Sequence, residues 1–199
     1  VVDSPDLSLN ISRELLQHDR QLKVIAANLE KKIKSELEKF LKNDRDGYEK
    51  FFKGFGRNLE YGIYTSYGMK KDVLADLLLF YSAKQQKMVT FEEYTAAMPT
   101  DQKAIYYAAG DSTDRLAKLP VVNSVLDRGY DVLLCTQDVD EFCMQVLGTY
   151  AEKQIKSINA EDALPETEEE KKAAQEKAEA GKPVLEAVKE ALGDQVKEV

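Results

Sequence analysis

The chain has 199 residues, 43% of them apolar, and carries a formal net charge of -8. This composition is that of a globular protein with one or two domains, and its acidic balance argues against non-specific nucleic-acid binding, which needs clustered lysine and arginine. No apolar run is long enough to span a bilayer and the first residues do not form a secretory signal. We therefore expect a cytoplasmic chain without a membrane or nucleic-acid partner.

The first notable segment is the polar stretch at residues 9–17, which turns directly into a helix. It carries Asn10, Arg13 and Gln17. A guanidinium beside the free N–H groups of a helix start favours an anion, of which phosphate is the most common. The alternative is an exposed arginine at a helix start, with Asn10 as a helix cap.

Residues 13–42 have the pattern of one long amphipathic helix. Their apolar positions recur at steps of three and four residues, with lysine and glutamate between them. The polar cluster at 43–47 is typical of a helix end, because short polar side chains and glycine favour caps and turns. Similar stripes follow at 48–63 and 69–80. The sequence thus predicts a coil of three helices over residues 13–80.

Beyond residue 80 the pattern changes to short strands that alternate with helices. Residues 103–109 are rich in β-formers and lead into the capping residues 111–113. The expected elements then are a helix from Pro120 to Gly129, a strand at 130–135, a helix from Asp138 to Tyr150 and a strand at 155–158. This order predicts a small α/β/α sandwich with a short, mainly parallel sheet over residues 81–160.

The end of the chain is strongly charged. Residues 161–180 contain eight acidic residues and only three lysines. Because little apolar surface accompanies these charges, we expect a solvated acidic linker or a marginal charged helix over residues 161–182. Helical periodicity returns at residues 183–199. The fold class predicted for the whole chain is mixed α/β.

Cysteine and histidine, the residues typical of thiol catalysis and zinc sites, are few: Cys135, Cys143 and His18. The cysteines lack a Cys-x-x-Cys spacing and one histidine does not make a zinc site, so we expect no metal. A cysteine near a helix start can be a nucleophile with a lowered pKa, which would make the chain a cysteine-dependent enzyme. Cys143 occupies an inward position of its helix, however, and a core thiol is the favoured interpretation.

Several motifs together resemble one family. Residues 1–14, VVDSPDLSLNISRE, resemble the signature of the middle segment of the heat-shock protein 90 chaperones. LKVI at 22–25, IYYAAGDS at 105–112 and DVDEF at 138–142 follow in the family's order, and the acidic linker comes next. The resemblance covers the whole chain and is closer to the bacterial branch, high-temperature protein G.

The resemblance implies an organisation of the chain as part of a larger chaperone. Its expected parts are the catalytic loop that ends the large middle subdomain (1–12), the helical coil (13–80), the small α/β/α subdomain (81–160), the acidic linker (161–182) and the truncated first helix of the C-terminal dimerisation domain (183–199).

The resemblance also implies a split site of ATP hydrolysis. Arg13 would contact the γ-phosphate of ATP held by an N-terminal nucleotide-binding domain, with Gln17 supporting it and Asn10 shaping the loop. ATP and Mg are the expected cofactors of the full-length protein. This chain alone is expected to hold no cofactor, to be inactive and to be a monomer, whereas the full-length protein would be a homodimer that acts on unfolded clients.

A second, less specific site follows from the helix that begins at Asp138. Glu141, Phe142 and Met144 would place apolar side chains beside acids at the rim of the sheet, as expected of a surface that contacts clients. The alternative to a chaperone is a non-enzymatic interaction module. Such a module would use the helical coil and the small α/β domain as a docking platform.

Overall fold

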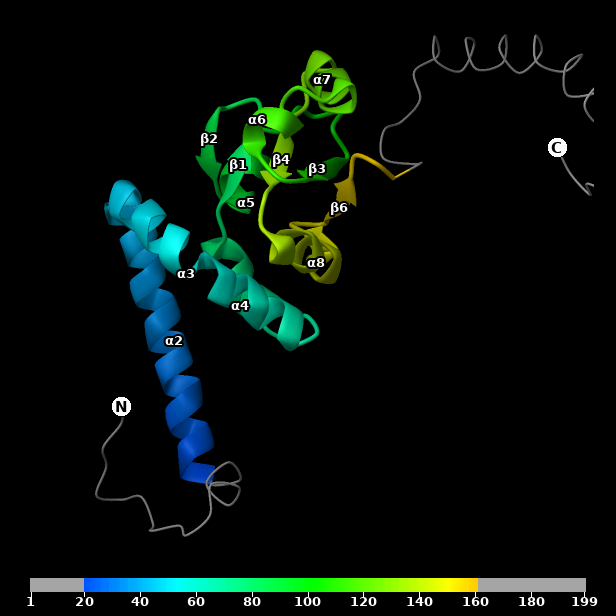
Figure 1. The fold of residues 1–199 in the computed structure, drawn as a ribbon. Helices are drawn as coiled ribbons and strands as arrows, with labels where there is room; N and C mark the ends of the chain where they lie inside the picture. The colour runs from blue at the N-terminus through cyan, green and yellow to red at the C-terminus, as the bar shows by residue number, and fades with distance from the viewer. Residues whose placement is uncertain (1–19, 161–199) are drawn as a thin grey trace, which may run out of the picture. The chain divides into compact units, whose positions relative to one another are not determined.

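The computed structural model describes residues 20–160, which all belong to the first of the two units into which the chain divides. A helical half comes first and an α/β half follows (Figure 1). The helical half contains α2 (Arg20–Asn43), α3 (Arg45–Thr65), α4 (Lys71–Leu74) and the 3-10 turn η1 (Ala75–Leu77). The predicted first two helices are confirmed over these described residues.

The turn between α2 and α3 depends on Asp44. Its side chain accepts a hydrogen bond from the backbone N–H of Gly47 at 2.9 Å and so caps α3. A Cβ at Gly47 would collide with the Asp44 carboxyl group and the Phe40 ring. The polar cluster predicted to end the first helix therefore also begins the second, as capping physics requires.

The third helix is shorter than the pattern predicts. We expected a helix over 69–80, but η1 ends at Leu77, Leu78 is extended and Phe80 begins a strand. Residues 77–80 are all buried, with at most 3% of each exposed. A run that is buried on every side has no solvent-facing residues to reveal its period, so the sequence pattern alone did not separate helix from strand here.

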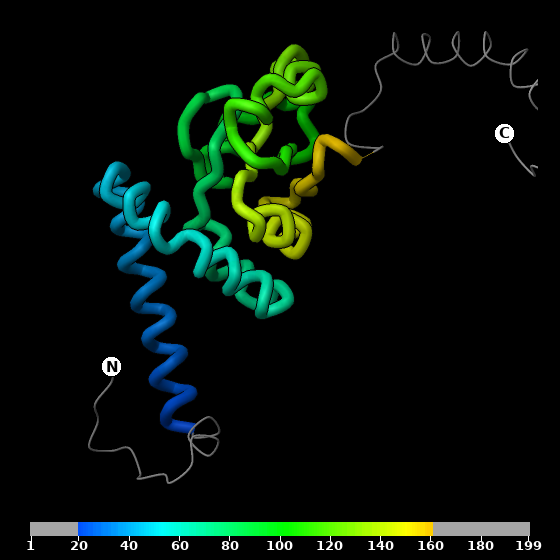
Figure 2. The backbone as a smooth tube through the Cα atoms, viewed as in Figure 1, coloured from blue at the N-terminus to red at the C-terminus, as the bar shows by residue number. Residues whose placement is uncertain are grey.

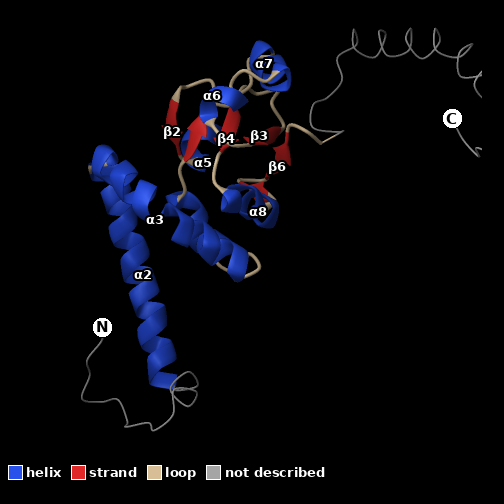
Figure 3. Ribbon diagram, in the orientation of Figure 1, coloured by secondary structure: helices blue, strands red, loops and turns tan. Residues whose placement is uncertain are grey.

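Within residues 20–160, six strands form a single mixed sheet. Figure 3 shows strands in red with helices packed around them. In chain order the strands are β1 (Phe80–Ser82), β2 (Lys87–Val89), β3 (Ala104–Ala109), β4 (Val132–Cys135), β5 (Thr149–Tyr150) and β6 (Lys153–Ser157). Their spatial order is β2-β1-β4-β3-β6-β5. The central strands β4, β3 and β6 are parallel, as predicted, while β1, β2 and β5 join antiparallel and had not been predicted.

Helices cover both faces of this sheet. They are α5 (Phe91–Ala96), α6 (Thr113–Leu116), α7 (Pro120–Asp127) and α8 (Asp138–Leu147). Alternate residues of β3 point to opposite faces, as a strand requires. Tyr107 packs in the core that α3 and α8 share, whereas Tyr106 stacks on Tyr130 near the end of α7, with the ring centroids 6.1 Å apart. The predicted α/β/α sandwich is confirmed.

The helix predicted from Asp138 to Tyr150 ends early. Gly148 adopts φ +63° after Leu147, and Tyr150 lies in β5. The Tyr150 ring stacks on Phe91 at 5.1 Å between centroids, and its hydroxyl donates to Asp76 at 2.7 Å. Tyr150 therefore matches the helical pattern of the sequence, but in the structure it lies in β5 and packs on Phe91.

Candidate functional site

The residues predicted to bind phosphate, Asn10, Arg13 and Gln17, lie outside the described residues. The candidate site that the structure does describe is the contact between α3 and α8. The two helices pack against each other although they are far apart in the sequence (Figure 2). This contact joins a pair of buried carboxyl groups, a pocket and a group of exposed aromatic rings.

The start of α8 is organised by Asp140, which is 4% exposed. Its Oδ2 atom accepts hydrogen bonds from the backbone N–H groups of Thr136 at 2.8 Å and Gln137 at 2.9 Å. These donors would otherwise be unsatisfied at the helix start. Of the acidic residues at this helix start, Asp140 makes these capping contacts, while Glu141 is exposed.

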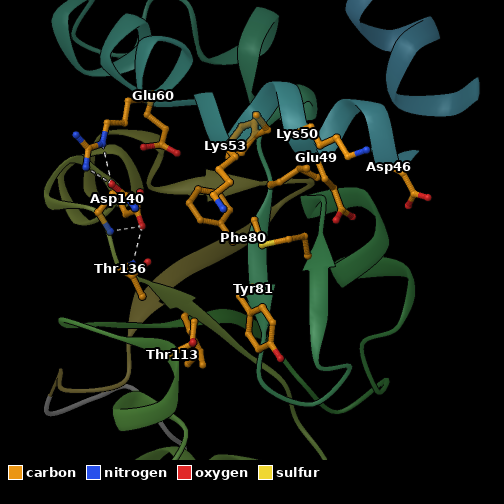
Figure 4. Close-up of a pocket in the computed structure, with 16 residues that line it drawn as sticks. Asp46, Glu49, Lys50, Lys53, Glu60, Phe80, Tyr81, Thr113, Thr136 and Asp140 are labelled. Carbon is orange, nitrogen blue, oxygen red and sulfur yellow. Dashed lines mark hydrogen bonds between the residues drawn. The ribbon is translucent and has the colours of Figure 1, made fainter. Parts of the chain in front are cut away.

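Glu60 on α3 meets Asp140 inside the protein (Figure 4). Only 2% of Glu60 is exposed, and burial, together with the charge of Asp140, raises the pKa of Glu60 to about 9. Burial also raises the pKa of Asp140, but its two backbone N–H donors favour the ionised form. Burial and mutual repulsion therefore favour a pair that shares one proton, and the backbone donors to Asp140 favour Glu60 as the residue that carries it.

A pocket of about 550 Å³ lies beside this carboxyl pair. Phe52, Leu79, Phe80 and Leu134 contribute apolar lining, while Lys50, Lys53 and Arg57 of α3 add positive charge. Figure 4 shows Glu60 and Asp140 at one end of the pocket and Phe80 near its middle. The pocket is thus amphipathic, with its buried acids at one end.

Arg57 lines this pocket and also a second one. Its guanidinium donates to Gln137 Oε1, with the Nε atom 2.7 Å away and Nη2 also in contact. The second pocket, of about 370 Å³, is also lined by Arg57, together with aromatic side chains of α3 and α8. One arginine therefore forms part of the wall of both pockets.

Three exposed rings form what we call the aromatic surface: Tyr61, Tyr64 and Phe142. Their exposed fractions are 55%, 40% and 51%. The centroids of Tyr64 and Phe142 are 5.6 Å apart, and those of Tyr61 and Tyr64 are 5.9 Å apart. Exposed apolar groups that gather in this way are typical of interaction sites.

The predicted client surface is only partly compatible with this arrangement. Glu141 and Phe142 are exposed, but the placement of Met144 on that surface is wrong, because Met144 is 0% exposed in the core. Two residues along a helix correspond to a rotation of roughly 200°, which turns Met144 toward the sheet. Tyr61 and Tyr64 were missed, although their spacing of three residues outside the apolar stripe was a signal.

Both cysteines are core residues. Cys135 and Cys143 are 1% and 0% exposed, and burial raises the pKa of each thiol far above its ordinary value. Glu60 and Asp140 add negative charge that raises both pKa values further. The prediction of a core thiol at Cys143 is confirmed, and a cysteine-dependent enzyme has no reactive thiolate to use here.

Residues 20–160 show neither a metal-binding cluster nor a membrane-spanning helix. There, no three or more histidine, cysteine, aspartate or glutamate side chains gather in a way that would hold a metal ion. Within the same range no helix has the length and apolar character needed to cross a membrane.

The chain is similar in sequence to proteins of a known family. A sequence model of the family described as Hsp90 protein matches residues 1–199. Chaperone protein HtpG of Clostridium perfringens is 54% identical over 199 residues, and that of Bacillus subtilis is 53% identical over the same length. Each match covers 100% of this chain and 32% of the relative, so the chain spans about a third of their length.

A solved structure agrees with the sequence relatives. The middle domain of a Plasmodium falciparum heat shock protein superimposes with a TM-score of 0.66 at 26% identity, covering 72% of this chain and 60% of that one. The family match extends over the whole chain, and the fold is that of the family's middle domain. This chain therefore belongs to the Hsp90 family, in the bacterial branch whose members are named HtpG.

Proposed function

We propose that this chain is the part of an ATP-dependent chaperone that presents an apolar surface to unfolded proteins and supplies Arg13 to a nucleotide-binding domain. The observation that carries the client-binding role is the aromatic surface, where Tyr61, Tyr64 and Phe142 stay exposed beside the acidic start of α8. The chaperone names of the HtpG relatives support the same role.

The physical basis of client binding is the removal of apolar area from water. Unfolded chains expose apolar side chains that a folded protein buries, and aromatic rings supply large contact areas at a low cost in side-chain entropy. Glu141 and Asp138 are exposed beside the rings and would favour client segments that combine apolar residues with lysine or arginine.

Binding of a carboxymethylated, permanently unfolded protein to the chain tests this role. Replacing Tyr64 and Phe142 together by serine should weaken binding about fivefold or more, since central aromatic contacts are commonly worth more than 1 kcal/mol each. Leu119→Ser is the matched control, because Leu119 is exposed at the start of α7, away from these rings. Equal affinities for all three proteins would contradict the proposal.

The role of Arg13 concerns the full-length protein. Phosphoryl transfer spreads negative charge over the transferred group, and an arginine supplied from a second domain is worth about a thousandfold or more in rate. Gln17 and Asn10 would hold that arginine in place. Supplying the cation from a separate domain makes hydrolysis conditional on domain closure.

Arg13→Ala in the full-length protein should slow ATP hydrolysis strongly while nucleotide affinity stays nearly unchanged. Arg20→Ala, seven positions further on, should leave the rate as it is. An unchanged rate in Arg13→Ala would favour the second candidate, a non-enzymatic docking module, which needs no phosphate contact. We further propose ATP with Mg and a homodimer for the full-length cytoplasmic protein, and a monomer without nucleotide for this chain alone.

A further inference from the structure

Two acidic side chains from different helices meet where α3 packs on α8. Glu60 and Asp140 are 2% and 4% exposed, and Glu60 Oε2 accepts no hydrogen bond from any donor among the described residues. The other titratable groups that face the pair are Arg57 on α3, Cys143 on α8 and Cys135 at the end of β4. Both thiols are neutral, so Arg57 is the cation that acts on the pair.

The guanidinium of Arg57 does not replace the missing donor. Arg57 is exposed and its Nε and Nη2 atoms donate to Gln137 rather than to either carboxyl group. Two negative charges in contact inside a protein repel strongly, so the pair holds a proton instead. The contact between α3 and α8 thus contains a hydrogen bond that exists only while that proton is bound.

We propose that Glu60 and Asp140 form a proton-dependent joint, through which rising pH loosens the packing of α8 on α3. Tyr64 lies on α3 and Phe142 on α8, and their rings touch. The same joint therefore controls how fully the aromatic surface is assembled. That last consequence rests on the proposed function, whereas the joint itself does not.

The direction of the pH effect follows from proton linkage. When the helices separate, Glu60 regains an ordinary pKa near 4.5, whereas in the packed state its pKa is about 9. Between these values the packed state binds one proton more than the open state, so packing is most stable at low pH and weakens as pH rises toward 9. Each pH unit in that window shifts the opening equilibrium by up to about tenfold.

Glu60→Gln separates the joint from other pH effects. The amide has nearly the same shape, donates an N–H to Asp140 and does not titrate. Glu141→Gln is the matched control, because Glu141 neighbours Asp140 on the same helix but has an exposed side chain. The control removes one charge from α8 without touching the buried pair.

The reporter is the rate at which a maleimide labels Cys143 in the native 199-residue chain. Cys143 is 0% exposed on α8, so labelling requires α8 to lift away. Each rate is divided by that of the denatured chain at the same pH, which removes the intrinsic reactivity of the thiol. Labelling is measured between about pH 6 and 9 for the wild type and both variants.

We expect the wild type to label faster than Glu60→Gln, by a ratio that grows up to about tenfold per pH unit. Glu141→Gln should follow the wild type. A ratio that stays constant with pH overturns the joint. If Glu60→Gln does not fold, infrared spectroscopy of the wild type provides the test. The carbonyl band of a protonated carboxylic acid at pH 7 supports the joint, and the absence of that band overturns it.

Client binding distinguishes this inference from the proposed function. If the labelling ratio is flat while the Tyr64 and Phe142 double variant loses client affinity, the joint fails and the proposed function stands. If the ratio rises with pH while the double variant binds clients normally, the joint stands and the proposed client surface fails.

Discussion

Helices α2 and α3 have similar amphipathic sequences but opposite degrees of burial. No residue of the 24 in α2 is buried by the described part of the chain, and Val24, Leu29 and Ile33 are 54%, 42% and 56% exposed. Five of the 21 residues of α3 are buried: Tyr48, Phe52, Gly56, Glu60 and Ile63. An apolar stripe therefore shows that a helix has a face to cover, and only the fold shows whether a neighbour covers it.

The two helices also differ in what stabilises them. Along α2, Glu36 pairs with Lys32 at 2.8 Å and with Lys39 at 2.9 Å, all three on exposed side chains. In α3 the buried Tyr48 hydroxyl donates to the Leu77 carbonyl at 2.6 Å, which fixes the helix to η1. Exposed ion pairs contribute little to stability, whereas buried packing and satisfied buried polar groups contribute much.

The largest effect is expected from a comparison of two isoleucine substitutions, one in each helix. Ile63→Ala in α3 should lower the free energy of unfolding by about 2–5 kcal/mol, because it leaves a cavity at a fully buried site. Ile33→Ala in α2 should change it by less than about 0.5 kcal/mol. Urea denaturation followed by circular dichroism measures both, and equal losses would show that α2 is packed as tightly as α3.

An intermediate effect is expected from one hydroxyl group. Tyr48→Phe keeps the ring but leaves the buried Leu77 carbonyl without its donor, which should cost about 1–3 kcal/mol of unfolding free energy. Tyr61→Phe removes a hydroxyl from a tyrosine that is 55% exposed and should be neutral. A neutral Tyr48→Phe would mean that water replaces the lost hydrogen bond.

The smallest effect should come from the charge network on α2. Its two lysines lower the pKa of Glu36 to about 2, so this contribution is present above the ordinary glutamate range and is lost as pH falls toward 2. Glu36→Gln should leave the melting temperature nearly unchanged at neutral pH and physiological salt, because the network is exposed and screened. A clear drop in that melting temperature would show that the network acts as a rigid unit.

Local signals predicted α3 and the central strands of the sheet, while segments without a local signature were missed. The hairpin of β1 and β2 turns at Gln86, whose φ of 53° is unusual for a residue other than glycine, so no Gly or Asn marked the turn. Helix α5 did have a signature: Thr90 and Glu93 form a capping box. That pattern is visible in the sequence, so α5 was predictable from it.

The candidate site was less predictable than the fold. Glu60 and Asp140 each look like ordinary charged residues of a helix surface, and their meeting depends on the packing of α3 on α8. Arg57 and Gln137 are likewise 80 residues apart. Only tertiary structure brings such partners together, so helical periodicity contained no information about them.

The position of Arg57 in the walls of both pockets has a thermodynamic consequence. A molecule that enters the larger pocket and draws the guanidinium away from Gln137 changes the wall of the pocket beside Phe142. Occupancy of the two pockets is then coupled, and linkage requires the coupling to be equal in both directions. If the second pocket belongs to the proposed client surface, a ligand of the larger pocket would change client affinity, and a bound client would change the affinity of that ligand by the same factor.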